Sequence, residues 1–319
     1  MGVVSRIFRR IRQLGGIRLL KGYVSLGVLW KVLRAVFPGI LFKPYNAVHA
    51  RVLDIVAPAL KKKYGGVLSD VMSKYESAVA REERSNIVWV CWLQGRDAAP
   101  ALVKSCISSL ERNLPGRDIR VLDEEGIGRY IRFPEHIERK WKKGLIPPAA
   151  YSDLLRLELL IKYGGTWIDS TVFCSGPDYP PEYLDAGLFM FQFARAEDRR
   201  YSGISNWFIT SSRPGNPVLM VLRDMLYRYW EDFDCFVYFF VFHLFFSMIV
   251  EREPRIAEDM PYGYSPACHF LQRHLGDAFN EADWRELTSK VAFHKLTYRL
   301  GEYILADKGN YFARLLEMK

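Results

Sequence analysis

The sequence predicts an α/β fold: a mostly parallel sheet flanked by helices, preceded by a basic helical extension. Residues 87–92 are apolar without alternation, which is typical of a strand buried on both faces of a parallel sheet. A helical pattern follows at residues 100–110, and a second strand at residues 118–123. This β-α-β order favours parallel strands joined by right-handed crossovers. At 319 residues, the chain is long enough for one substantial core, with or without an appendage.

The basic extension follows from an uneven distribution of charge. Residues 1–53 hold ten Lys or Arg and no acidic residue, whereas the whole chain has a net charge of +9. The same segment is rich in Ile, Leu, Phe and Trp, so its helices would have one apolar and one basic face. Such helices lie flat on anionic membranes, whereas charges recur too often here for a spanning helix, and no signal-peptide pattern is present. We therefore expect residues 1–45 to bind an anionic membrane surface, with a helical extension packed on the domain as the alternative. No motif supports nucleic-acid binding.

The remaining elements can be placed along the chain in order. Residues 46–85 are expected to form a helical connector, and residues 152–161 a helix that leads into a short strand before Asp169. The apolar run at residues 236–250 is shorter than the roughly 20 residues needed to cross a bilayer, so a buried core helix is favoured over a lipid-facing one. Further expected elements are a strand at 188–193, a helix at 217–230 and a C-terminal packing helix at 301–319.

Several common chemistries have no support in the sequence. The five cysteines are widely spaced and none forms a CxxC pair, which argues against a disulfide framework and against structural zinc. They are typical of small buried hydrophobic residues in a reducing compartment. No HExxH, P-loop or GxGxxG motif stands out, and no serine, histidine and aspartate suggest a hydrolytic triad.

Residues 152–171, SDLLRLELLIKYGGTWIDST, are the most informative part of the chain. Asp153 and Arg156 are three residues apart on the expected helix, so their side chains can meet on the same side. The Gly-Gly pair then ends that helix, and a short strand leads to Asp169. Open α/β sheets bind ligands at the carboxyl ends of their strands, which is where Asp169 would lie. By themselves, an Asp and an Arg at this spacing are more often a surface ion pair.

The order SDLLR followed by KYGGTWIDST resembles the DxD glycosyltransferases that share the DllR...yGGxYxD signature, among them α-mannosyltransferases and glucosylating bacterial toxins. The sequence is most similar to the capsular polysaccharide synthesis branch of that group. The similarity extends to NIVWVCWLQG at residues 86–95, SNW at 205–207, YW at 229–230 and HKLTY at 294–298. It implies a GT-A-like (Rossmann-like) glycosyltransferase domain at residues 86–300 and transfer with retention of configuration.

The resemblance also implies roles for individual residues. In similar enzymes an aromatic residue at the position of Trp92 stacks on the nucleobase, and the loop that includes Gln94 binds the nucleotide. Asp153 and Arg156 hold sugar or ribose hydroxyls, which suits the bidentate fork of arginine. Core packing is the alternative for Trp92. Further contacts to the donor or acceptor are expected from Gly165, Asn206, Trp207 and Lys295, with core packing as the alternative for Asn206 and Trp207.

A divalent metal ion, Mn²⁺ or Mg²⁺, is the usual means of neutralising a departing diphosphate. The family motif, DxD, supplies two aspartates for it. Here the corresponding residues are Asp169-Ser170-Thr171, so a neutral hydroxyl replaces the second carboxylate. We expect Asp169 and Thr171 to contact the metal, with His294 as a further ligand and Lys295 as a point charge on phosphate.

These features predict a hexosyltransferase that moves a sugar from a nucleotide-sugar donor to a growing capsular or surface polysaccharide on a lipid-linked acceptor. Catalysis would depend on Asp169, Asp153 and Arg156. The basic N-terminus fits a peripheral protein of the cytoplasmic face of a bacterial plasma (inner) membrane. Two alternatives stay open. A glycoside hydrolase would need two carboxyl groups flanking the sugar bond, and the missing second aspartate is compatible with a catalytically degenerate sugar-binding scaffold.

Overall fold

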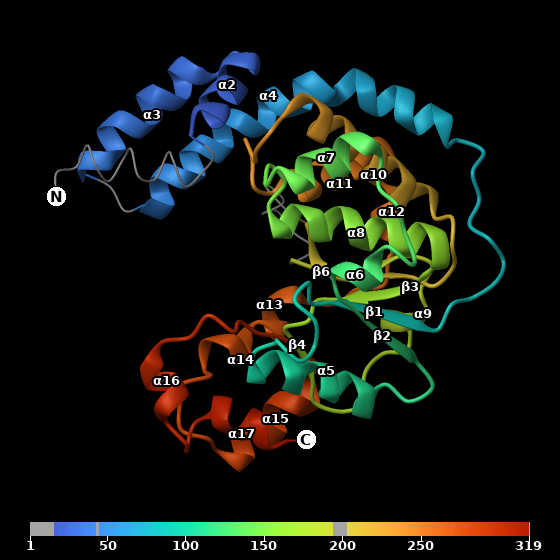
Figure 1. The fold of residues 1–319 in the computed structure, drawn as a ribbon, viewed down its shortest axis with the longest axis vertical. Helices are drawn as coiled ribbons and strands as arrows, with labels where there is room; N and C mark the ends of the chain where they lie inside the picture. Colours follow the sequence, from blue (N-terminus) through green and yellow to red (C-terminus); the bar gives the residue numbers. More distant parts are fainter. Residues whose placement is uncertain (1–15, 43–44, 194–202, 319) are drawn as a thin grey trace. The chain divides into compact units, whose positions relative to one another are not determined.

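The computed structural model describes residues 16–42, 45–193 and 203–318, and it confirms the predicted α/β class (Figure 1). The chain divides into two compact units, each assembled from three stretches of sequence. Unit 1 comprises the described part of residues 1–77, with 133–155 and 217–254. Unit 2 comprises residues 78–132, 156–216 and 255–319, again as far as they are described. These stretches interleave along the chain, whereas the sequence suggested a linear division at residues 45, 85 and 300.

Unit 2 is built around a five-stranded sheet in the order β2-β1-β3-β6-β5. Its parallel half consists of β1 (Ile87–Cys91), with β2 (Asp118–Leu122) on one side and β3 (Gly165–Ile168) on the other. The strand β6 (Ile204–Ser211) runs antiparallel to β3, and β5 (Phe189–Gln192) runs antiparallel to β6. Every strand except β6 therefore points the same way, which confirms the mostly parallel sheet. The strand β6 itself was not evident from the sequence pattern.

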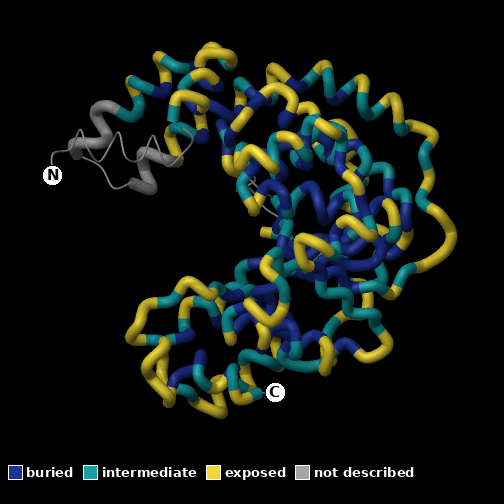
Figure 2. The backbone as a smooth tube through the Cα atoms, viewed as in Figure 1, coloured by how far each residue is buried: buried dark blue, intermediate teal, exposed yellow. Residues whose placement is uncertain are grey.

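The alternation of side chains along β1 defines the two faces of this sheet. Val88 and Val90 pack into an apolar core with α5 (Ala101–Asn113), a helix that the sequence predicted. Trp89 points to the opposite face, where its ring lies edge-on to Tyr130 with 5.1 Å between ring centres. Figure 2 shows β1 and β3 buried along almost their whole length. The sheet is therefore covered on both faces at β1, as the unbroken apolar run of that strand predicts.

A second, two-stranded sheet also belongs to unit 2. Its strands β4 (Val172–Cys174) and β7 (Phe293–Lys295) pair antiparallel, so the segment after β3 lies against a segment from near the end of the chain. Phe173 on β4 packs into a separate apolar cluster that includes Leu315 of the C-terminal helix. In place of the single C-terminal helix that was predicted, the structure has two short helices, α16 (Glu302–Ala306) and α17 (Tyr311–Glu317). The other helices of unit 2 are α6 (Glu124–Ile127), α9 (Glu182–Asp185), α12 (Arg255–Glu258), α13 (Ser265–Cys268), α14 (Phe270–Arg273) and α15 (Glu281–Lys290).

The Gly164-Gly165 pair joins α8 (Pro148–Tyr163) to β3 through close backbone packing. Both glycines have positive φ angles, 68° and 95°, which residues with a Cβ rarely adopt. A Cβ on Gly165 would lie 2.2 Å from the carbonyl oxygen of Ile87. The Gly164 carbonyl accepts a hydrogen bond of 3.0 Å from Trp89 Nε1. Gly165 is therefore required for β3 to approach β1 closely, and a Cβ on Gly164 would crowd Arg213 and Pro214.

Unit 1 is helical. Its longest helix is α4 (Tyr45–Lys74), which continues through Pro58 and packs with α10 (Pro217–Asp232) and α11 (Val241–Arg252). The helix α11 is largely buried, as predicted for the apolar run at residues 236–250 that supplies most of it. The helix α8 begins in unit 1 and continues into unit 2 from Arg156. In the described part of the chain, no helix combines the length and the apolarity needed to cross a bilayer. The other helices of unit 1 are α2 (Ile17–Ser25), α3 (Leu29–Phe42) and α7 (Glu135–Lys142).

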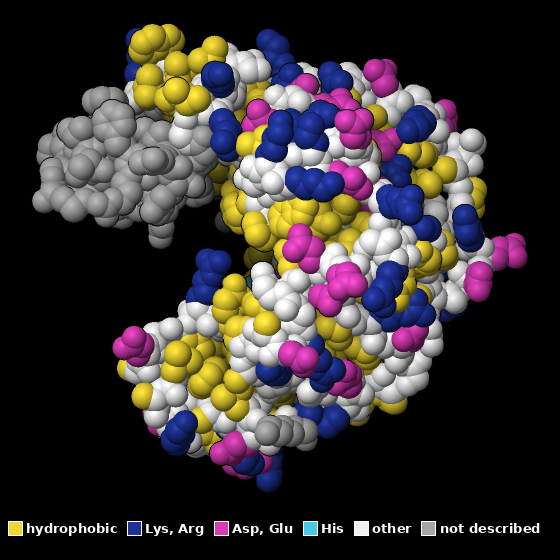
Figure 3. Space-filling view, viewed as in Figure 1, with side chains coloured by type: hydrophobic (Ala, Val, Ile, Leu, Met, Phe, Trp, Pro, Cys, Tyr) yellow, Lys and Arg dark blue, Asp and Glu magenta, His cyan; other side chains and the backbone are white. Residues whose placement is uncertain are grey.

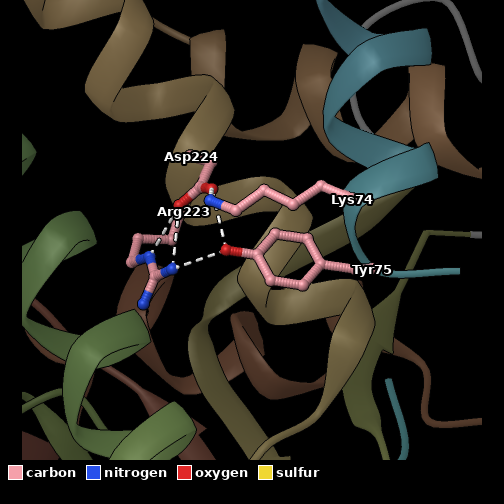
Figure 4. Close-up of polar contacts among 4 residues, drawn as sticks. All are labelled: Lys74, Tyr75, Arg223 and Asp224. Atoms are coloured by element: carbon pink, nitrogen blue, oxygen red, sulfur yellow. Dashed lines mark hydrogen bonds and ion pairs between the residues drawn. The ribbon is translucent and has the colours of Figure 1, made fainter. Parts of the chain in front are cut away.

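A polar cluster in unit 1 ties the end of α4 to α10 (Figure 4). Asp224 Oδ2 accepts hydrogen bonds of 2.8 Å from Lys74 Nζ and 2.8 Å from the Tyr75 hydroxyl. Arg223 donates to Asp224 Oδ1 through Nε at 2.9 Å and Nη2 at 2.8 Å, and to the Tyr75 hydroxyl at 3.0 Å. Burial would raise the pKa of Asp224, but these donors hold it below its ordinary value. We name these four residues the Asp224 cluster.

Candidate functional site

The candidate site lies at the carboxyl ends of the parallel strands of unit 2. Trp92 directly follows β1, Asp123 follows β2 and Asp169 follows β3. Because these three strands are neighbours and run in parallel, the residues that follow them lie at the same edge of the sheet. Open α/β sheets bind their ligands at this edge.

Asp169 is held between two cations. Lys295 Nζ donates a hydrogen bond of 2.7 Å to Asp169 Oδ2, and Arg156 Nη2 lies 3.5 Å from Oδ1. Trp167 Nε1 donates to the same Oδ1 at 2.9 Å. The side chains of Asp169 and Lys295 are 24% and 19% exposed, whereas that of Arg156 is only 5% exposed. The carboxylate is therefore fixed by three donors and is still reachable from solvent. We name Asp169, Lys295 and Arg156 the Asp169 cluster.

The backbone explains how Lys295 reaches a carboxylate so distant in the sequence. Val172 N donates to Asp169 O at 2.9 Å, which closes a tight turn after β3. The strand β7 lies beside this turn, because Lys295 pairs with Val172 and Leu296 N donates to Thr171 O at 2.8 Å. Lys295 Nζ also donates to the Thr171 hydroxyl at 2.7 Å. The HKLTY segment thus belongs to the site because of strand pairing.

Arg156 comes from α8, and its guanidinium is held by several contacts. It lies 5.1 Å from the centre of the Trp167 ring, which is a cation–π distance. It also donates a hydrogen bond to the carbonyl oxygen of Asn206 on β6. These contacts orient a buried cation toward Asp169, and a buried cation requires such partners. The predicted partner Asp153 lies one turn earlier on α8, in the part assigned to unit 1, and is half-buried.

The Asp169 cluster has one negative and two positive side chains, which gives it a formal charge of +1. Burial favours the protonated carboxyl group, but the charges of Lys295 and then Arg156 hold the pKa of Asp169 below its ordinary value. Cys91, the last residue of β1, is influenced by the charges of Asp169 and Arg156. Burial, together with the Asp169 charge, raises the pKa of that thiol to about 12, so it stays neutral. The site therefore has the charge of one that attracts anions.

The residues predicted to ligate a metal do not form a set. His294 and Lys295 are successive residues of β7, and successive strand residues point to opposite faces. His294 is fully buried, with Nε2 3.1 Å from Ser175 Oγ. At Asp169 both carboxylate oxygens accept from a cation or an indole, and the Lys295 ammonium bridges Asp169 and Thr171. Among residues 16–42, 45–193 and 203–318, no three His, Cys, Asp or Glu side chains are grouped as a metal site would require. The donors present suit an anion better than a dication.

Trp92 and Tyr298 form the aromatic part of the site. Their rings lie edge-on, with centres 5.2 Å apart and planes at 84°. Tyr298 is exposed and Trp92 is partly exposed, although Trp92 Nε1 is buried and has no hydrogen-bond partner among the described residues. Such a pair offers ring surface on which a flat base can stack. Gln94 lies in the exposed loop between β1 and α5.

Three other residues, which were predicted to contact the sugar donor or the acceptor, have structural roles in the fold. Trp207 is buried in the main core of unit 2, where it stacks on Phe191 with 4.8 Å between ring centres. Core packing, the alternative reading for this tryptophan, therefore describes its position. Asn206 supports the site through its backbone carbonyl, which accepts from Arg156. Gly165 acts through its backbone as well, because it lets β3 approach β1.

His269 is a neighbour of the site that sequence reasoning missed. It lies between α13 and α14, edge-on to Trp207 with 5.9 Å between ring centres. Burial lowers its pKa, and the nearby charge of Lys295 acts in the same direction. The ring is therefore neutral at pH 7 and can both donate and accept hydrogen bonds. Its surroundings in the sequence match no motif, so only the folded chain reveals it.

The fold and the site together define an α/β protein with an anion-attracting centre at the carboxyl edge of its sheet. The chain belongs to the capsular polysaccharide synthesis protein family, whose profile matches residues 40–315. The match includes the whole Asp169 cluster and the Trp92–Tyr298 pair. It confirms the family resemblance on which the sequence interpretation depended.

Two similarities to individual proteins are weaker. The protein "Subversion of eukaryotic traffic protein A" of Legionella pneumophila subsp. pneumophila is 26% identical over 175 residues, which are 54% of this chain and 24% of that protein. The chain thus spans about a quarter of the length of this curated relative. Among solved structures, "PaToxG Glycosyltransferase" is similar with a TM-score of 0.38 and 12% identity, over 63% of this chain and 80% of that one. Similarity at these levels does not carry an activity from one chain to another.

Proposed function

We propose that this protein is a glycosyltransferase that moves a hexose from a nucleotide-sugar donor to a growing capsular or surface polysaccharide, with a lipid-linked glycan as the acceptor. Membership of the capsular polysaccharide synthesis family supports the pathway. The observation that carries the chemistry is the Asp169 cluster, a partly exposed carboxylate held by two cations at the carboxyl edge of the sheet. Its net positive charge suits a diphosphate, and the Trp92–Tyr298 pair suits a nucleobase.

In the proposed reaction, the bond between the anomeric carbon of the sugar and the diphosphate oxygen breaks. A bond forms from an acceptor hydroxyl oxygen to that carbon, and the diphosphate keeps the electron pair of the broken bond. The acceptor hydroxyl releases its proton to a diphosphate oxygen. Lys295 and Arg156 would stabilise the charge that develops on the diphosphate, and Asp169 would position both cations. Retention of configuration is what the family resemblance implies for this step.

A glycoside hydrolase fits the site less well. Such an enzyme needs a carboxyl group that stays protonated near neutral pH and acts as a general acid. The pKa of Asp169 is shifted in the opposite direction, because the charges of Lys295 and Arg156 outweigh the effect of burial. A degenerate sugar-binding scaffold would make the same contacts with a nucleotide sugar, so it would differ from a transferase only in lacking turnover.

A thermal-shift screen of nucleotide sugars, with and without Mn²⁺, tests the proposal when it is followed by a transfer assay. We expect one nucleotide sugar to raise the melting temperature and to be turned over. The Asp169→Ala variant should keep its circular dichroism spectrum and lose turnover at least about a hundredfold. Release of sugar from an oligosaccharide without any nucleotide would indicate a hydrolase, and binding without turnover would indicate a scaffold.

We propose in addition that the N-terminal helices hold the protein peripherally on an anionic membrane, at the cytoplasmic face of the plasma membrane. Residues 1–15 and 43–44 of the predicted segment lie outside the described residues. In α2 and the start of α3, Ile17 and Val24 are exposed and Trp30 is 75% exposed. Figure 3 shows hydrophobic side chains at the surface of this region, with Lys and Arg beside them. On such a surface, the apolar side chains can insert into a membrane and the basic side chains can bind anionic lipid headgroups. The exposed basic residues here are Arg18, Lys21, Lys31 and Arg34.

Co-sedimentation with liposomes tests the membrane proposal. The full-length protein should sediment with vesicles that contain phosphatidylglycerol and not with pure phosphatidylcholine, and salt should weaken the binding. The double variant Arg18→Glu/Lys21→Glu should bind at least about tenfold more weakly, since each basic residue near the surface contributes about 1 kcal/mol. The matched control is Arg285→Glu/Lys290→Glu on α15, which reverses two exposed charges elsewhere. Equal sedimentation of the two double variants would contradict the proposal.

A further inference from the structure

The Asp169 cluster raises the question of what neutralises the diphosphate. The sequence suggested a divalent metal ion bound by Asp169 and Thr171. We infer that the Lys295 ammonium, supported by Arg156, binds the donor diphosphate directly and makes a divalent metal ion unnecessary. This inference rests on the proposed function, since it names the group that would receive the leaving diphosphate.

Geometry is the first support. Lys295 Nζ lies 2.7 Å from Asp169 Oδ2 and 2.7 Å from Thr171 Oγ1, so a cation already bridges the two oxygens that a metal would use. The other carboxylate oxygen, Oδ1, accepts from Trp167 and faces Arg156. A divalent ion at this point would have to displace one cation and would still lie next to the other. The donors of the cluster are thus arranged around an ammonium group.

The remaining hydrogen-bonding capacity of Lys295 is the second support. An ammonium group has three N–H donors. Two of them are directed to Asp169 and Thr171, and the third has no partner among the described residues. Since the side chain is 19% exposed, that third donor is accessible to a ligand. A phosphate oxygen is a suitable acceptor, because charge-assisted bonds from Lys to phosphate are short and strong.

Charge is the third support. With two cations and one carboxylate, the cluster attracts an anion before any metal arrives. Asp169 then acts as a positioning residue, because it holds Lys295 and Arg156 near one another against their mutual repulsion. This role differs from that of a metal ligand in one testable respect. Neutralising a metal ligand weakens diphosphate binding, whereas neutralising a carboxylate between two cations leaves two positive charges to receive the anion.

Titration calorimetry with inorganic pyrophosphate and the full-length protein tests the inference. Pyrophosphate has the diphosphate chemistry without base or sugar, so the experiment does not require the donor to be identified. We expect binding in the presence of EDTA, and an affinity at least about tenfold lower for Lys295→Met. Lys295→Arg should keep most of the affinity. Lys290→Met, on the exposed face of α15, is the matched control and should bind as the wild type does. Melting temperatures establish that each variant is folded.

The Asp169→Asn variant separates the two roles of the carboxylate. The inference predicts that this variant binds pyrophosphate in EDTA within about threefold of the wild type, or more tightly. Binding that requires Mn²⁺, binding that Lys295→Met leaves unchanged, or no binding under any condition would each overturn the inference. So would a loss of pyrophosphate binding in Asp169→Asn.

Failure of the inference can be distinguished from failure of the proposed function. If pyrophosphate binds through Lys295 in EDTA and no nucleotide sugar is turned over, the inference holds and the transferase proposal fails. If a nucleotide sugar is transferred only in the presence of Mn²⁺, the transferase proposal holds and the inference is overturned.

Discussion

Two aspartates in this molecule are each held between a lysine and an arginine, and they lie in different surroundings. In unit 1, Asp224 binds Lys74 and Arg223, with the Tyr75 hydroxyl as a further donor (Figure 4). In unit 2, Asp169 binds Lys295 and Arg156, with the Trp167 indole as a further donor. Both carboxyl groups have a pKa below the ordinary value. The kinds of charge are therefore the same in the two clusters.

The two clusters differ in how closely the arginine binds the carboxylate. Arg223 gives Asp224 two hydrogen bonds, at 2.9 and 2.8 Å, and gives Tyr75 a third contact. Arg156 approaches Asp169 at only 3.5 Å and directs another donor to a backbone carbonyl. The Asp224 cluster connects two helices, whereas the Asp169 cluster lies at the carboxyl edge of a sheet. The Asp224 cluster thus braces two helices, whereas the Asp169 cluster has the surroundings expected of a binding site.

The largest expected difference between the clusters is in activity. Asp169→Asn should lower the turnover of the nucleotide sugar identified by the screen at least about a hundredfold, because Lys295 and Arg156 lose the group that positions them. Asp224→Asn should change it less than about twofold, since that cluster lies among the helices of unit 1. Steady-state transfer assays on the two variants at equal folded fraction measure both effects. Equal losses of turnover in both variants would contradict the assignment of the site to the Asp169 cluster.

A second contrast lies within β7, where Lys295 belongs to the site and His294 to the core. Burial lowers the pKa of His294 to about 4 from its ordinary 6.5. Between these values the unfolded state binds more protons than the folded state, so stability falls as the pH drops from 6.5 toward 4. We expect urea unfolding to show a loss of about 2 kcal/mol over this range, and His294→Gln to lose clearly less.

If His294→Gln and the wild type lose the same stability between pH 6.5 and 4, burial of a neutral His294 is not the cause.

The elements that the sequence predicted well are those whose pattern is local. The unbroken apolar run of β1, the short strand pattern of β2 and the helical spacing of α5 each lie within one short window, and the structure has them at nearly the expected residues. The strands β4 and β7 have only three residues each. They exist because they pair with one another, and pairing between distant segments leaves no periodicity in either. The strand β6 was missed for a related reason, since its pairing with β3 and β5 is also long-range.

The site shows the same limit. Asp169 and Arg156 were found because they belong to one continuous motif, and the structure brings them within 3.5 Å. The phosphate-binding role expected for Lys295 came from resemblance, whereas its contacts with Asp169 and Thr171 depend on the pairing of β4 with β7. The position of His294 could have been anticipated. Two successive residues of a strand cannot both face one site, so a site-facing Lys295 places His294 in the core.

The smallest expected effect concerns the stability of the Asp224 cluster. Asp224→Asn removes the charge that Lys74 and Arg223 bind but leaves one acceptor oxygen in place of two. Lys74 is 60% exposed, so its contact is screened by solvent and contributes little. We expect a loss of about 1 kcal/mol in the free energy of unfolding at pH 7, measured by urea denaturation. Lys290→Met removes an exposed ion pair from α15 and should cost less than this.

The pH dependence of that loss tests its electrostatic origin. Because the folded-state pKa of Asp224 is below its unfolded value, the cluster stabilises the protein above the unfolded pKa of about 3.9, and this contribution disappears as the pH falls through the lower folded value. The difference between wild type and Asp224→Asn should therefore be constant from pH 7 to about pH 5 and shrink below about pH 4. A difference that stays constant below pH 4 would mean that packing between α4 and α10, and not the charge of Asp224, holds these helices together.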